Sequence, residues 1–90
     1  MNACLRANSE ILFKTVRKQT YILEPEKGLL RTLNTTASFL WNELQQDSSL
    51  QKLIEKTATA FHCEKKTVEN DVRDFIQQYI KKGYIIVINT

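Results

Sequence analysis

The chain has 90 residues, of which 42% are hydrophobic and 26% charged, and it contains two glycines and one proline. These proportions are typical of one small globular domain, and they exclude a disordered chain, a collagen-like repeat and a turn-dense β-sandwich. The net charge is +3, and the whole excess lies in residues 1–33, where six basic residues stand against three acidic ones. A chain of this size can form one core but no deep enclosed cavity, which disfavours chemistry inside a buried pocket.

The sequence gives no sign of a membrane span, an export signal or a disulfide framework. No apolar run approaches the roughly 20 residues that cross a bilayer, and residues 1–8 lack the apolar centre of a signal peptide. Cys4 and Cys63 are interpreted as two reduced thiols. We therefore expect a cytoplasmic protein with one domain over residues 1–90 and a flexible N-terminus over residues 1–10.

The first third of the chain has the β-branched, roughly alternating pattern of strands. The three runs are Ile11–Val16, Thr20–Glu24 and Leu29–Leu33, and Pro25–Gly28 separates the last two. Proline suits the early position of a turn and glycine supplies a positive φ. Because both connections are short, residues 11–33 are predicted to form a three-stranded antiparallel sheet.

From Asn34 onward the apolar residues repeat at helical spacing. The first predicted helix is capped by Asn34 or the residue after it, the second is capped by Ser48, and the third covers about Lys65–Lys82. The fold class is therefore α+β and winged-helix-like, with the N-terminal sheet followed by three helices over residues 34–83 and a short strand over residues 84–88.

The third predicted helix carries a wide apolar arc. Its apolar residues span about 140° of the helix, which is more than one core seam needs; they are Val68, Val72, Phe75, Ile76, Tyr79 and Ile80. The pattern alone favours packing of the whole arc under the sheet. The alternative is that one flank lines an open groove, and periodicity does not say which flank that is.

Enzymatic and nucleic-acid functions are both disfavoured by the residues present. Catalysis or metal binding needs converging side chains, and the chain offers one histidine, His62, and two cysteines far apart. We expect no catalytic residue, no metal site and no cofactor. Residues 64–82 carry five basic and four acidic side chains, so this nearly neutral segment would gain little from contact with the phosphates of DNA. A winged-helix DNA binder is one alternative, and a structural subunit that scaffolds an enzyme is another.

Three motifs in order resemble those of the PqqD-like proteins. Leu33–Ala37, followed by Trp41, resembles the LN-x-[TS]-A-x(3)-[IW] signature of that family. Ser49–Leu53 resembles its second helix, and Asp71–Tyr84 resembles its DV-x-x-FL-x-x-L-x-x-x-G ending. The likeness covers roughly residues 11–86. It implies a free-standing recognition element for ribosomally made, post-translationally modified peptides, of the kind used in lasso-peptide or PQQ-type pathways.

The resemblance also implies a mechanism and a set of partners. The leader segment of a precursor peptide would add as an extra strand beside the third strand and drop side chains into a groove against the third helix. A separate modifying enzyme or leader peptidase would then act on it, with no nucleic acid or membrane involved. The residues implied in leader binding are Leu29, Leu30, Arg31, Thr32, Leu33, Val68, Val72, Arg73 and Ile76. The two arginines would hold acidic leader side chains, and the edge of the third strand must be free of the C-terminal strand.

Overall fold

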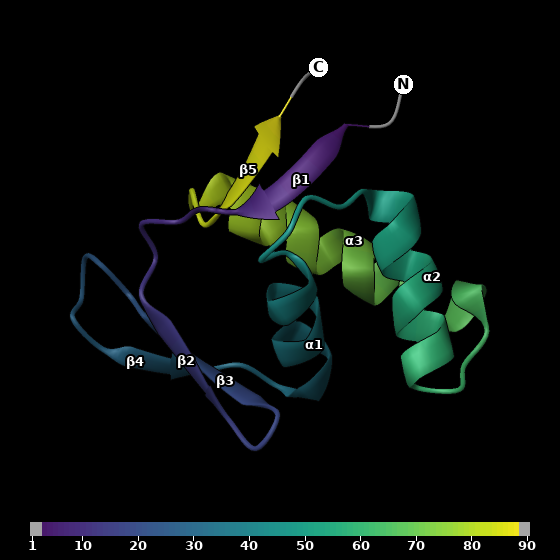
Figure 1. Cartoon of the computed structure of the whole chain (residues 1–90), viewed down its shortest axis with the longest axis horizontal. Coiled ribbons are helices and arrows are strands. Elements are labelled where there is room, and N and C mark those ends of the chain that lie inside the picture. The colour runs from purple at the N-terminus through teal and green to yellow at the C-terminus, as the bar shows by residue number, and fades with distance from the viewer. Residues whose placement is uncertain (1–2, 89–90) are drawn as a thin grey trace.

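The computed structural model describes residues 3–88. Its strands are β1 (Cys4–Ala7), β2 (Phe13–Val16), β3 (Gln19–Leu23), β4 (Leu30–Thr32) and β5 (Ile85–Ile88), and its helices are α1 (Thr35–Glu43), α2 (Leu50–Ala60) and α3 (Lys65–Lys81). The N-terminal antiparallel strands, the helices and the C-terminal strand follow one another as predicted, which confirms the α+β, winged-helix-like fold class (Figure 1).

Strands β2, β3 and β4 form the predicted antiparallel sheet, with β3 in the middle. The β3–β4 connection closes on a hydrogen bond of 2.8 Å from the Gly28 N–H to the Glu24 carbonyl. Gly28 has φ +65°, a left-handed conformation that glycine adopts at little cost. This tight turn brings β4 back along β3, with Arg31 opposite Ile22.

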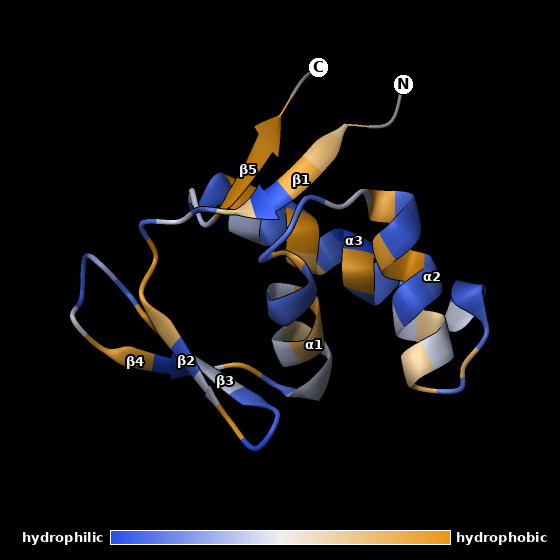
Figure 2. Ribbon diagram, in the orientation of Figure 1, coloured by the Kyte–Doolittle hydropathy of each residue, from blue (hydrophilic) through white to orange (hydrophobic). Residues whose placement is uncertain are grey.

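The N-terminus differs from the sequence prediction. The flexible segment expected over residues 1–10 is wrong for Cys4–Ala7, which form β1 and pair antiparallel with β5 (Figure 1). Leu5 and Ala7 are buried in the core, and Figure 2 shows their partner β5 as apolar along its length. This strand forms by pairing with β5 at the other end of the chain, so the local sequence pattern does not predict it. The prediction for residues 1–2 lies outside the described residues.

The helices begin and end where short polar signals place them. The Asn34 side-chain oxygen accepts the Ala37 N–H at 2.8 Å and caps α1, as expected. The cap of α2 is Ser49 and not Ser48, because the backbone of Ser48 is occupied in two 2.8 Å hydrogen bonds with Leu5. The first two helices thus start at side-chain caps, whereas Glu64, the N-cap of α3, makes no such hydrogen bond.

One hydrophobic core joins both sheets to the three helices. Trp41 of α1 is completely buried, and its ring lies edge-on to Phe13 of β2 at 5.8 Å and to Tyr79 of α3 at 6.3 Å. The indole therefore connects the sheet to α3 through the core. Because β5 pairs with β1, β5 does not cover the outer edge of β4.

Candidate functional site

Among residues 3–88, β3 is the one strand that pairs with β4, so the other edge of β4 is free in this part of the chain. The Leu33 N–H donates to the Thr20 carbonyl of β3 at 2.9 Å, and the Leu29 carbonyl accepts from the N–H of Glu24, the residue after β3, also at 2.9 Å. Bonding directions alternate along an antiparallel strand, so Arg31 also faces β3 while the N–H and C=O groups of Leu30 and Thr32 face outward. The edge therefore presents two donors and two acceptors, which an added strand could satisfy.

A groove of about 370 Å³ lies between β4, the start of α1 and the middle of α3. The core residues Leu33, Leu40 and Tyr79 lie beneath the groove, but they are almost fully buried and most of its exposed lining is polar. Phe75 is half-buried and stacks on Tyr79 with ring centroids 4.1 Å apart, which adds an aromatic wall. The side chains that α3 contributes to the lining are Asp71, Asp74, Phe75, Gln78 and Tyr79.

Three of the five candidate residues on and around β4 line this groove, namely Arg31, Thr32 and Leu33. Leu29 and Leu30 do not: their side chains are 62% and 60% exposed. Leu30 instead lines a shallow hollow elsewhere on the sheet with neighbours such as Leu23. Leu30 therefore does not line the groove, although its backbone belongs to the same strand edge.

The candidate residues on α3 fall on the other sides of the helix. Val68, Val72 and Ile76 are all buried in the core, Val72 completely, and they are absent from the groove lining. Arg73 is also absent from it. The groove is lined by the neighbouring flank, whose apolar member Phe75 stood at the edge of the wide arc seen in the sequence. That width was the one sequence signal for the groove.

The unpaired charge in the groove lining is acidic. Arg31 forms an ion pair with Glu24, Nε to Oε1 at 3.4 Å, and Arg73 forms one with Glu69, Nε to Oε2 at 3.1 Å. Within residues 3–88, neither Asp71 nor Asp74 makes an ion pair or a side-chain hydrogen bond. Both arginines expected to hold acidic leader side chains thus already have carboxylate partners.

Tyrosine side chains mark one end of the groove. Burial raises the pKa of Tyr79 above its ordinary value, and the nearby Arg31 guanidinium partly offsets the rise. Burial raises the pKa of Tyr84 as well, and Glu24 adds to it. Lys82 lies over both rings, 5.9 Å from the Tyr79 centroid and 5.8 Å from the Tyr84 centroid. Both phenols are therefore neutral at physiological pH.

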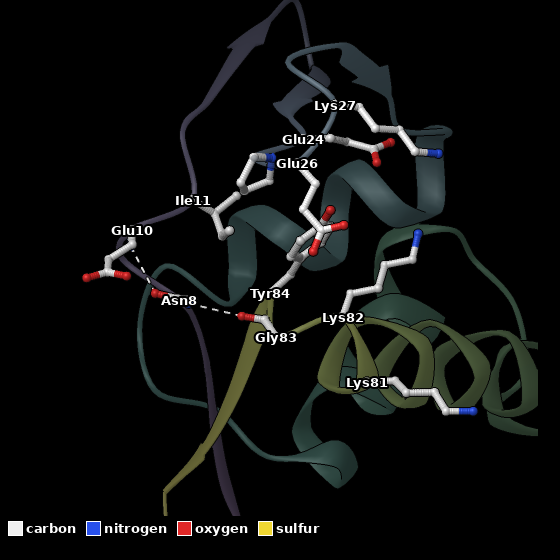
Figure 3. Close-up of a pocket in the computed structure, with 11 residues that line it drawn as sticks. Asn8, Glu10, Ile11, Glu24, Glu26, Lys27, Lys81, Lys82, Gly83 and Tyr84 are labelled. Atoms are coloured by element: carbon white, nitrogen blue, oxygen red, sulfur yellow. Dashed lines mark hydrogen bonds between the residues drawn. The ribbon is translucent and has the colours of Figure 1, made fainter.

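A second hollow, of about 620 Å³, lies between the β3–β4 turn and the end of α3 (Figure 3). Asn8 fixes its base, since its side chain donates to the Gly83 carbonyl at 3.0 Å and its backbone N–H to the Tyr84 carbonyl at 2.8 Å. Figure 3 shows side chains of the β3–β4 turn opposite the end of α3. Its charged lining is balanced: Glu10, Glu24, Glu26, Lys27, Lys81 and Lys82. This balance gives the hollow no preference for a charged ligand.

The described residues contain no cluster of side chains for metal binding. Over residues 3–88, no three His, Cys, Asp or Glu side chains lie together as a metal site requires. Cys63 is exposed and Cys4 half-buried, and both are free thiols. No helix in this part of the chain is long and apolar enough to cross a membrane. What the structure offers is an open strand edge beside a largely polar groove in which Phe75 presents a half-buried aromatic side chain.

These features define a class: a small winged-helix-like α+β protein with a groove beside an unpaired strand. The family model described as Coenzyme PQQ synthesis protein D (PqqD) matches residues 19–85, and the chain belongs to this family. The match runs from the start of β3 into β5 and so includes every groove residue. It confirms the resemblance read from the sequence motifs.

A solved structure supports the same fold. The chain is similar to the structure described as "TbiB1 in Complex with the TbiA(beta) Leader Peptide", with a TM-score of 0.77 and 16% sequence identity. The likeness covers 94% of this chain and 99% of that one. No curated protein matches the sequence.

Proposed function

We propose that this protein binds the leader segment of a ribosomally made precursor peptide as an additional strand on β4. It holds the precursor for a separate modifying enzyme or leader peptidase in the cytoplasm and performs no chemical step itself. Family membership supports this, as does the fold shared with a protein solved in complex with a leader peptide. The observation that carries the proposal is the free edge of β4 directly beside the groove.

The free edge supplies sequence-independent affinity. The outward N–H and C=O groups of Leu30 and Thr32 can make four main-chain hydrogen bonds, each contributing about 1 kcal/mol net. A leader that is disordered alone must be ordered on binding, which costs part of this gain. Main-chain bonds alone are therefore too weak and too general to select one precursor.

The groove supplies selectivity. Side chains on one face of an added strand would point toward α3, where Phe75 and Tyr79 offer an aromatic surface over the buried Leu40. One buried apolar anchor stabilises the complex by about 2 kcal/mol. In this proposal Val68, Val72 and Ile76 position the groove wall from the core and do not touch the leader.

Isothermal titration calorimetry tests the proposal with leader peptides encoded by small genes that neighbour this one. Thr32→Pro removes an outward N–H but no bond to β3, so binding should weaken by about tenfold. Thr32→Ala keeps the N–H and serves as the matched control, with affinity within about twofold of the original protein. Circular dichroism confirms that both variants keep their helices. Equal affinity of the proline and alanine variants would contradict strand addition at β4.

A further inference from the structure

We infer that the groove selects a leader strand carrying lysine or arginine two residues from an apolar anchor, with Asp71 and Asp74 as the acceptors of the basic side chain. The inference rests on the proposed strand addition at β4 and names the chemistry of the peptide that it takes. It reverses the expectation from the sequence, in which two arginines of the protein would hold acidic leader side chains.

The first step is the charge left over in the groove. Asp71 and Asp74 lie one turn apart on α3, both exposed and both in the lining. They make no ion pair within residues 3–88, whereas Arg31 at the opposite wall is already paired with Glu24 at 3.4 Å. A bound peptide thus meets two exposed carboxylates that have no partner within residues 3–88 and one guanidinium that already has a carboxylate partner. A cationic side chain complements this wall, and an acidic one would be repelled.

The second step is the alignment of strand and helix. The β3–β4 turn meets the end of α3 in the second hollow, and the end of β4 meets the middle of α3 in the groove. β4 and α3 therefore run alongside each other in opposite directions. A strand added to β4 would follow the same line and pass the acidic pair and the aromatic pair in turn.

The third step is the spacing. The midpoint of Asp71 and Asp74 is offset from that of Phe75 and Tyr79 by roughly 7 Å along the helix, at about 1.5 Å per residue. Side chains on one face of a strand recur every second residue, about 6.6 Å apart. One inward side chain can therefore cover the rings while the inward side chain two positions away reaches the carboxylates.

The positive net charge of the protein makes a preference for basic peptides informative about the groove. The net charge is +3, so non-specific attraction favours acidic peptides. A preference for basic peptides would run against that background and must come from a local acidic surface. It would also weaken with salt, because the carboxylates are exposed.

Selection from a randomised library of 15-residue peptides tests the inference without knowledge of the natural leader. We expect selected peptides to bind wild type and to share an apolar residue with lysine or arginine two positions away. Asp71→Asn with Asp74→Asn should weaken their binding about fivefold and remove its dependence on salt. The matched control is Glu64→Gln with Glu69→Gln, which makes the same charge change on or next to α3 outside the groove lining and should leave affinity unchanged.

The outcomes separate the inference from the function on which it rests. The inference would be overturned, and strand addition left standing, if the selected peptides lost affinity for the Thr32→Pro variant but shared no basic residue. The same conclusion would follow if they bound the Asp71→Asn, Asp74→Asn variant as tightly as the original protein. Peptides that bind equally well to Thr32→Pro, or a library that yields no binder to the folded protein, would overturn both. The inference would also be overturned if the Glu64 and Glu69 changes weakened the binding of basic peptides as much as the Asp71 and Asp74 changes do. The preference would then come from the overall charge of the protein and not from the groove.

Discussion

The two flanks of α3 differ in environment although both carry apolar residues. One flank, with Val72 and Ile76, is buried against the other elements, whereas the adjacent flank, with Phe75, lines the groove beside β4. Between them stands Tyr79, which is 5% exposed and belongs to both. The comparison teaches that the groove beside this helix lies where its apolar stripe meets its polar side, and not at the centre of the stripe.

The largest expected effect is a loss of stability on truncation of Trp41, the core residue that packs against α3. Trp41→Ala should lower the free energy of unfolding by about 3–5 kcal/mol, because the indole is fully buried between Phe13 and Tyr79. Urea denaturation followed by circular dichroism measures it. A loss below 1 kcal/mol would show that the core does not hold α3 against the sheet through this residue.

A substitution on the buried flank should lower the free energy of unfolding and leave leader affinity almost unchanged. Ile76→Ala should cost about 2–4 kcal/mol of unfolding free energy, since the side chain is 5% exposed in the core. Leader affinity, measured by calorimetry at a temperature where the variant is folded, should stay within about threefold of wild type. Ile76 would have to be reassigned to the groove if stability were unchanged and affinity fell.

The groove flank should show the opposite pattern. Phe75→Ala should weaken leader binding by about tenfold through loss of an apolar contact of roughly 1–2 kcal/mol. Its effect on unfolding should be about 1 kcal/mol, because the ring is half-buried and its main partner is Tyr79. The same two measurements used for Ile76 apply here. If Phe75 and Ile76 proved interchangeable in both, the distinction between the flanks would fail.

The smallest effect concerns Tyr79 and pH. Burial raises the pKa of its phenol in the folded protein above the unfolded value near 10. The contribution of the neutral Tyr79 phenol to the free energy of unfolding is therefore fully present below about pH 10, and it is lost as the pH rises through the folded pKa. Tyr79→Phe cannot ionise, so its stability should fall less between pH 9 and pH 11 in urea titrations. Parallel curves for the two proteins would contradict the burial of this phenol.

Most of the fold follows from local patterns, and the groove follows only in part. The Pro25–Gly28 turn, the Asn34 cap and the helical repeats are short-range signals, so the sheet and helices are predictable. Strand β1 is not, because four residues with weak alternation become a strand only through pairing with β5. On the strand side, three residues of the groove lining were among those predicted, namely Arg31, Thr32 and Leu33, and their role in binding stays a prediction. The helix side was not, because helical periodicity places Phe75 and Ile76 in one arc and only the packing of α1 and β4 divides them.

The most direct test of strand addition is amide hydrogen exchange by NMR, with and without the leader peptide that binds most tightly. In the free protein the Leu30 and Thr32 amides face outward and should exchange quickly, whereas the Leu33 amide, bonded to Thr20 at 2.9 Å, should be protected. Leader binding should protect Leu30 and Thr32 and leave Leu33 little changed. Protection that appeared at β1 or α2, with Thr32 still exchanging quickly, would contradict a leader strand on β4.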